Sequence, residues 1–207
     1  MAVSPRPKRP VDRRLLTALA EYPVMASLVG AAMAERFSAA AAAPLGVLAS
    51  VPLVDLQATV AKTAAAGKIV FVNMDSTPGL GHDPGALTYL KGIGAVAVCS
   101  TRAGIIERAS ALGLLAMQKV FVTDRSNLHR SVQSIARSQP DLVQLMPAVV
   151  LPYVERQARD LGVPYLAAGF VQAETDVADA LRHGAAGVCT SDEDLWDLRR
   201  AGLPTAR

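Results

Sequence analysis

Residues 163–191, VPYLAAGFVQAETDVADALRHGAAGVCTS, contain the pattern that decides the fold. A short apolar run stands at each end, and the segment between them has helical periodicity. Val177, Ala180 and Leu181 fall on one face of that predicted helix, which faces the sheet. Gly184 follows where a helix commonly ends. A strand, a helix and a second strand in this order predict a βαβ unit with its two strands parallel.

The same unit repeats along the whole chain. Eight apolar runs follow one another at a spacing of roughly two dozen residues, typical of a strand and a short helix. They cover residues 23–28, 45–50, 68–75, 95–101, 114–122, 141–147, 163–169 and 185–191. Eight buried strands alternating with helices predict an α/β fold, a small (β/α)8 TIM-barrel-like domain. Residues 29–44 predict a short or irregular first βα unit.

An open doubly wound sheet is the alternative architecture. The count of eight units, with no change of composition to mark a second domain, favours the closed barrel. The chain has 207 residues, of which 51% are hydrophobic and 4% aromatic, which suits one domain of helices packed on small side chains. We expect a flexible, basic, proline-rich tail at residues 1–12 and a single barrel domain at residues 13–207.

The N-terminal segment accounts for the excess of positive charge, which is +3 for the chain. Its basic side chains are candidates for contacts with a nucleic-acid backbone: Arg6, Lys8, Arg9, Arg13 and Arg14. The segment leads into no signal-peptide hydrophobic region, and no uncharged apolar run reaches the roughly 18 residues of a membrane span. We therefore expect a cytoplasmic protein without a membrane partner.

Metal and cofactor chemistry is not indicated. Cys99 and Cys189 lie in apolar runs, without another cysteine or histidine at metal-ligand spacing, so we expect buried, reduced thiols. His82, His129 and His183 show no metal spacing either. A phosphate-binding P-loop, a dinucleotide fingerprint and a serine-hydrolase motif are absent from the sequence. We expect no metal and no cofactor.

The ends of the seventh and eighth strands predict a phosphate-binding cup. Phosphate sites of barrels are often built from these two loops and a helix N-terminus. Gly169, Phe170 and Val171 supply one half. Cys189, Thr190 and Ser191 supply the other half, and we expect the hydroxyl groups of Thr190 and Ser191 to be available to donate to a ligand. The stretch DEDLWDL that follows predicts the last helix. Small residues there let backbone N–H groups face an anion.

Other polar residues stand at neighbouring strand ends. Asp75 is a candidate ligand contact, or a general base if the protein is an enzyme, and Ser100 and Arg102 follow the next strand. Gln118 and Lys119 are adjacent in the fifth strand, so only one of them points into the barrel. We expect it to be Gln118, because its side chain is uncharged.

Several motifs in order resemble the glycerol-3-phosphate responsive antiterminators, the GlpP family of bacterial regulators. They are GKIVFVNMDSTPGLG, AVCSTRAGIIERASALGLLAMQKVFVTDRSNL, PDLVQLMPAVV and the stretch from GVPYLAAGFVQ to SDEDLW. The resemblance implies a TIM-barrel-like fold that senses glycerol 3-phosphate and binds the leader mRNA of glycerol-utilisation genes. The matching positions are Asp75, Gly79, Ser100, Thr101, Arg102, Gln118, Phe121, Asp124, Pro147, Gly169, Thr190 and Ser191.

The chain also departs from that family pattern at strand ends. Asn73, Lys119, Gln144, Ala148 and Ala168 stand where the family has His, Arg, Glu, Gly and Gly. A lysine in place of an arginine loses two-pronged recognition of an anion. The alternative function is a small barrel enzyme acting on a phosphorylated triose or sugar, with Asp75 as its acid or base. The sequence leaves open whether the chain forms a homo-oligomer.

Overall fold

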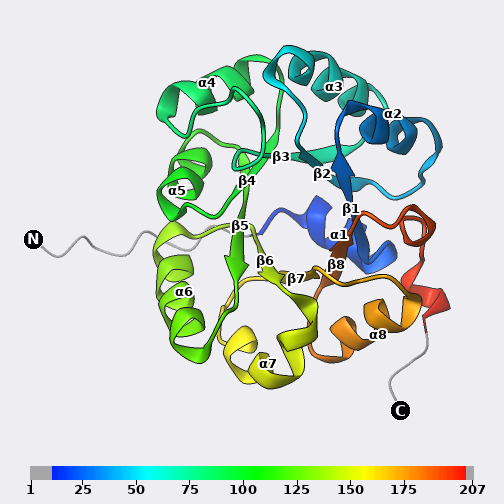
Figure 1. The fold of residues 1–207 in the computed structure, drawn as a ribbon, viewed down its shortest axis with the longest axis vertical. Coiled ribbons are helices and arrows are strands. Elements are labelled where there is room, and N and C mark those ends of the chain that lie inside the picture. Colours follow the sequence, from blue (N-terminus) through cyan, green and yellow to red (C-terminus); the bar gives the residue numbers. More distant parts are fainter. Residues whose placement is uncertain (1–10, 204–207) are drawn as a thin grey trace, which may run out of the picture.

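The computed structural model describes residues 11–203, which form a closed barrel of eight parallel strands with helices around it (Figure 1). Neighbours in the sequence are neighbours in the barrel, and β8 closes it against β1. The strands are β1 (Val24–Val29), β2 (Leu45–Ala49), β3 (Ile69–Asn73), β4 (Ala97–Ser100), β5 (Leu115–Phe121), β6 (Leu142–Met146), β7 (Tyr165–Ala168) and β8 (Gly187–Thr190). The TIM-barrel-like α/β fold predicted from the repeat is confirmed.

Helices follow seven of the strands, and one precedes β1. They are α1 (Arg13–Glu21), α2 (Ala31–Ala40), α3 (Leu53–Ala65), α4 (Pro84–Gly92), α5 (Ala103–Ala111), α6 (Arg125–Ser138), α7 (Leu151–Arg159) and α8 (Glu174–Arg182). Within the part of the chain that the structure describes, no helix is long and apolar enough to cross a membrane.

The alternation of side chains along the strands separates two hydrophobic clusters. One lies inside the barrel and includes Met25, Phe71 and Leu142; the other lies between the strands and the helices. Both clusters consist of fully or nearly fully buried side chains. The strands are therefore apolar on both faces, as parallel strands covered by helices require.

Helix α1 closes the N-terminal end of the barrel. Leu15 and Leu19 of α1 are buried in the same cluster as the inward-facing strand residues. A Cβ atom on Gly187 would stand 2.4 Å from the carbonyl oxygen of Pro23 and 3.1 Å from Leu19, so only glycine fits at the start of β8. The barrel interior is thus closed at the N-terminal ends of its strands, and a pocket can open only at their C-terminal ends.

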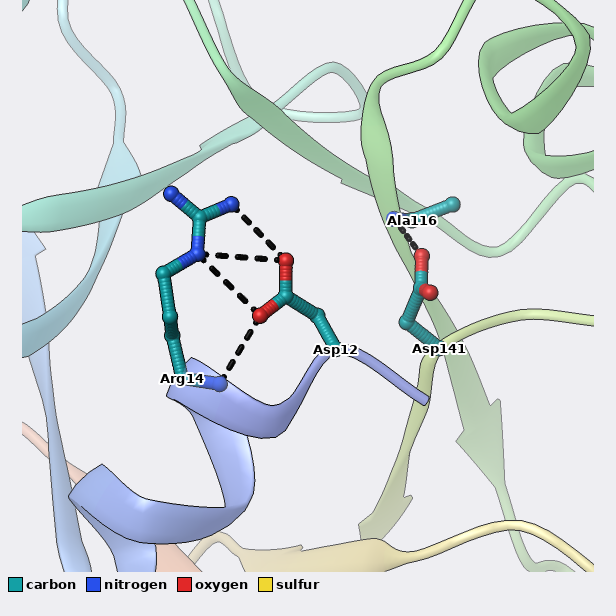
Figure 2. A network of polar contacts seen from close by, with 4 residues as sticks. All are labelled: Asp12, Arg14, Ala116 and Asp141. Carbon is teal, nitrogen blue, oxygen red and sulfur yellow. Dashed lines mark hydrogen bonds and ion pairs between the residues drawn. The ribbon is translucent and has the colours of Figure 1, made fainter. Parts of the chain in front are cut away.

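Polar side chains hold the chain at this closed end (Figure 2). Asp12 caps α1: its carboxylate accepts hydrogen bonds from the backbone N–H of Arg14 at 2.8 Å and from the Arg14 guanidinium at 2.7 Å. The buried carboxylate of Asp141 accepts from the backbone N–H of Ala116 at 2.8 Å, which joins the beginnings of β5 and β6.

Of the basic residues predicted to contact nucleic acid, Arg13 and Arg14 belong to α1. The other three, Arg6, Lys8 and Arg9, lie outside the described residues. A contact of these five residues with nucleic acid stays a prediction.

Two local expectations are wrong. The first βα unit is not short or irregular, because α2 is a regular ten-residue helix that buries Ala34 and Phe37. The segment after β8 forms two 3₁₀ turns, Glu193–Leu195 and Arg200–Gly202, instead of an α-helix. Trp196 is buried there, edge-on against Phe37, with its ring N–H donating to the carbonyl of Thr190. These two contacts of the indole ring hold the chain in a turn, because an α-helix here would move Trp196 away from Phe37.

Candidate ligand pocket

A pocket of about 470 Å³ opens at the C-terminal end of the barrel. Its lining comes from seven strands, all but β4, and from the loops after β7 and β8, so only the closed barrel assembles it. The lining residues are Ser27, Val47, Ala49, Asn73, Lys119, Gln144, Met146, Ala168, Gly169, Phe170, Val171, Gln172, Cys189, Thr190, Ser191 and Asp192. This is the end at which barrel proteins bind their ligands.

Four polar side chains form the part of the pocket that belongs to the strands. Ser27, Asn73, Lys119 and Gln144 each follow, two residues later, an inward-facing apolar residue of the same strand. Because strand side chains alternate, these four continue the interior column upward and face the cavity. Among the described residues that line the pocket, Lys119 is the one cation and Asp192 the one carboxylate.

The Gln144 side chain carries an unused hydrogen-bond acceptor. The residue is only 6% exposed, and its Oε1 atom has no hydrogen-bond partner within the described residues. A buried acceptor without a donor costs about 1–3 kcal/mol. A ligand hydroxyl that donates to this atom would recover that cost, so Gln144 is suited to bind a polyol.

The thiol of Cys189 also lines the pocket. Burial raises its pKa to about 12, although Lys119 and a hydrogen bond with Gln144 act in the opposite direction. Burial raises the pKa of Cys99, inside the barrel below it, still further. Both groups are therefore neutral thiols near neutral pH, and neither serves as an anionic ligand or a nucleophile.

The predicted cup residues of the β7 loop all line the pocket. Gly169 has a φ of +81° and Phe170 a φ of +62°, so two consecutive residues are left-handed. This geometry is easy for glycine and uncommon for phenylalanine. The Phe170 ring is 73% exposed, at the rim of the pocket. The turn brings the backbone of residues 169–171 to the mouth of the barrel.

Thr190 joins the two halves of the cup. Its hydroxyl donates to the carbonyl of Val171 at 2.7 Å and accepts from the backbone N–H of Asp192 at 3.1 Å. We expected this hydroxyl to be available to a ligand, but its proton is already used between the loops. Ser191, which is exposed, has the hydroxyl at the rim. Since only a three-residue 3₁₀ turn follows β8, the helix dipole expected there is largely missing.

Asp75, Ser100 and Arg102 do not line the pocket. The Asp75 carboxylate accepts from the Ser100 hydroxyl and from the backbone N–H of Thr101, both at 2.7 Å. Ser100 in turn accepts from the backbone N–H of Arg102 at 3.1 Å. This network connects the loops after β3 and β4. The carboxylate thus has two loop donors, and its position gives no support to a role as acid or base in the pocket.

Gln118 faces away from the barrel interior, against our expectation. Its amide contacts the hydroxyls of Ser134 and Ser138 on α6, whereas Lys119 lines the pocket. The alternation in β5 runs through Leu115 and Met117 inside and through Ala116 outside. Both faces of this strand are apolar, so the sequence pattern did not indicate which of the two side chains points into the barrel. The buried glutamine is tolerated outside because α6 supplies its hydrogen bonds.

We did not predict that Lys119, Gln144, Asn73 and Ser27 line the pocket, although the first three were noted as departures from the family pattern at strand ends. The available signal was a lone polar residue inside an apolar run, as in FVNM and LVQLM. A polar side chain in a strand buried on both faces must find a partner or a cavity. Within residues 11–203, no three His, Cys, Asp or Glu side chains cluster closely enough to hold a metal ion.

The sequence matches the family model of the glycerol-3-phosphate responsive antiterminators over residues 24–196. This chain belongs to that family. The matched segment begins with β1 and ends at Trp196, so it contains the complete barrel and the pocket.

Two solved structures agree with the assignment. The glycerol uptake operon antiterminator regulatory protein from Listeria monocytogenes is 27% identical, with a TM-score of 0.78 over 84% of this chain and 94% of that chain. A glycerol uptake operon antiterminator-related protein from Thermotoga maritima is 25% identical, with a TM-score of 0.76 over 86% and 99%. The uncharacterized protein YgcP from Escherichia coli is 28% identical over 145 residues, 68% of this chain and 74% of that protein.

Proposed function

We propose that this protein is a transcription antitermination regulator that senses glycerol 3-phosphate and binds the leader mRNA of glycerol-utilisation genes. A regulator of this kind acts on nascent mRNA, so we also propose that it works in the cytoplasm. The family assignment supports the regulatory role. The choice of ligand rests on the pocket, in which the Lys119 ammonium and the Gln144 amide face one cavity.

The chemistry of a phosphorylated polyol suits this lining. Lys119 offers a positive charge to the phosphate. We expect the backbone N–H groups of residues 169–171 to face it as well, since those of Gln172 and Asp192 are bonded within the protein. The unpartnered oxygen of Gln144 accepts a hydrogen bond and therefore requires a donor, such as a hydroxyl of the glycerol moiety. One cation and one amide thus recognise the two ends of a small molecule.

The direct test of the ligand is thermal unfolding with glycerol 3-phosphate, glycerol and inorganic phosphate. A ligand that binds only the folded chain stabilises it by mass action and so raises the Tm. At a ligand concentration 100 times the Kd, the free energy of unfolding increases by about 2.7 kcal/mol. We expect a shift with glycerol 3-phosphate at concentrations where glycerol and phosphate give none. Equal shifts with inorganic phosphate would reject recognition of the polyol.

The RNA half of the proposal has its own test. A labelled leader transcript is titrated with the protein, with and without glycerol 3-phosphate, at low and at physiological salt. We expect binding that depends on the ligand. A protein that binds glycerol 3-phosphate but leaves the transcript free even at low salt would not be an RNA-binding antiterminator.

A further inference from the structure

A second hollow, of about 410 Å³, lies on the outside of the barrel between β5 and α6. We call it the α6 groove. It is lined by Thr101, Gln118, Lys119, Val120, Phe121, Asn127, Arg130, Ser131, Ser134 and Arg137. Thr101, Gln118 and Phe121 belong to the motifs that carry the family resemblance, and the ligand pocket contains none of the three.

The α6 groove is basic and polar. Helix α6 has the sequence RSNLHRSVQSIARS, with three arginines and no acidic residue. Arg130 and Arg137 are exposed and line the groove together with hydroxyl and amide side chains, and no carboxylate is among its described lining residues. Such a surface attracts a polyanion.

The spacing along α6 suits a strand of phosphates better than a single anion. Arg130 and Arg137 are two helical turns apart on one face, which places their Cα atoms about 10 Å from each other. Ser134 lies between them on the same face. Two guanidinium groups at this separation can contact different phosphates of one backbone.

Two further features favour RNA over a free anion. The Phe121 ring is 53% exposed at the end of β5, where a base can stack on it. The Oδ1 atom of Asn127 is buried and has no hydrogen-bond partner within the described residues. This acceptor needs a donor, which a ribose 2′-hydroxyl or a base amino group provides.

We propose that the α6 groove binds a single-stranded segment of RNA, with Arg130 and Arg137 on the phosphates and Phe121 under a base. This inference rests on the proposed function, which names an RNA but no surface. The groove adjoins the ligand pocket through β5, because Lys119 lines both. A ligand held by Lys119 therefore contacts the strand on which the groove is built.

The test measures fluorescence anisotropy of the labelled leader transcript at several salt concentrations. The double variant Arg130→Gln, Arg137→Gln removes two charges from the groove. The matched control, Arg108→Gln with Arg156→Gln, removes the same charge from exposed positions on α5 and α7 outside it. We expect roughly tenfold or greater loss of affinity in the groove variant, and a salt dependence of log Kd reduced by about 1.4.

Phe121→Ala gives an independent signature. Loss of base stacking should weaken binding roughly fivefold or more while the salt dependence stays unchanged, because no phosphate contact is removed. None of the variants should alter the Tm shift caused by glycerol 3-phosphate, since the three groove residues do not line the pocket.

The outcomes separate the two proposals. If wild type binds the transcript and the groove variants match the Arg108, Arg156 control, the groove is rejected and the antiterminator function stands. If wild type binds glycerol 3-phosphate but no transcript at low salt, both the groove and the RNA half of the proposed function are rejected.

Discussion

The hydroxyl of Thr190 donates a hydrogen bond to the backbone carbonyl of Val171 at 2.7 Å. This bond joins the last residue of β8 to the loop after β7, and both line the pocket. Thr190 also accepts from the N–H of Asp192, so a single hydroxyl positions the two halves of the cup. The geometry of the predicted anion site therefore depends on a side chain whose own hydrogen bonds are made within the protein.

The variant Thr190→Val tests whether these two hydrogen bonds position the loops after β7 and β8. The variant keeps the shape of the side chain and removes both hydrogen bonds, which leaves the buried carbonyl of Val171 unpaired and costs about 1–3 kcal/mol of unfolding free energy. Glycerol 3-phosphate affinity should fall as the loops separate. Urea unfolding and the ligand-induced Tm shift measure the two effects. Thr88→Val, which loses an exposed bond to Pro84 on α4, is the control and should change neither.

Lys119→Met should abolish the charge that faces the phosphate. A hydrogen bond to a charged partner contributes about 1.5–3 kcal/mol, so we expect a loss of affinity between about tenfold and a hundredfold. Calorimetric titration with glycerol 3-phosphate measures it. Lys62→Met removes an equally long side chain from an exposed ion pair with Glu35 and should bind as wild type does. Unchanged affinity in Lys119→Met would refute the assigned role of the pocket lysine.

Gln144→Met and Gln118→Met should shift stability in opposite directions. Methionine at position 144 removes a buried acceptor that has no partner, so the free protein should gain about 1 kcal/mol. Methionine at position 118 leaves Ser134 and Ser138 without their shared partner and should cost about 1–3 kcal/mol.

Only the substitution at position 144 should weaken binding of glycerol 3-phosphate, because Gln118 lies outside the pocket. Urea denaturation of the free proteins and calorimetry with the ligand measure both predictions. If Gln144→Met binds the ligand as tightly as wild type, the buried amide does not contact the polyol.

Gly169→Val should abolish ligand binding and leave the barrel folded. An added Cβ atom would fit, since it would meet Pro147 at ordinary distances of 3.6 and 3.7 Å. The φ of +81°, however, is unfavourable for any residue with a side chain. A left-handed residue with a side chain costs about 1–2 kcal/mol, more when it is β-branched. The loop should therefore shift. Gly104→Ala on α5, where an added Cβ atom would meet no other part of the protein within 4 Å, should instead stabilise the chain slightly.

Stability should decrease in alkaline solution because of the buried thiols. The pKa of Cys189 is about 12 in the folded chain, above its ordinary value of 9.0 in the unfolded chain, and the pKa of Cys99 is also raised. The unfolded chain loses these protons first, so the stabilisation is complete below pH 9 and is lost as pH rises toward 12. The slope should reach about 1.4 kcal/mol per pH unit for each thiol.

Urea denaturation between pH 8 and pH 11 measures this slope. The variant Cys99→Ala, Cys189→Ala should show a flatter dependence on pH than wild type, because its lysines and tyrosines are unchanged. Identical slopes would mean that the thiols ionise equally well in the folded chain.

The repeat of apolar runs was sufficient to predict the barrel from the sequence, and all eight runs coincide with strands. Each run is a local signal: it predicts the burial of residues such as Val70, Phe71 and Val72 without knowledge of the strands with which they pair. The position of Gly169 at the mouth of the pocket was also predictable, because a glycine at a strand end is visible in the sequence. The regular helix α2 was not, because its stability comes from burying Phe37 against Trp196, 159 positions away.

The sequence by itself determined the period of the chain, and therefore the number and order of strands and the end at which the pocket lies. Only the tertiary structure decided which face of each strand turns inward. Both faces of a parallel strand are buried, so hydrophobicity cannot distinguish Gln118 from Lys119, and closure of the barrel settles it. The same closure brings Asn73, Lys119 and Gln144 to one cavity. Closure also lets the Thr190 hydroxyl donate to Val171, which lies in the loop after β7. Such contacts join segments that are distant in the sequence, so they form only when the chain has folded.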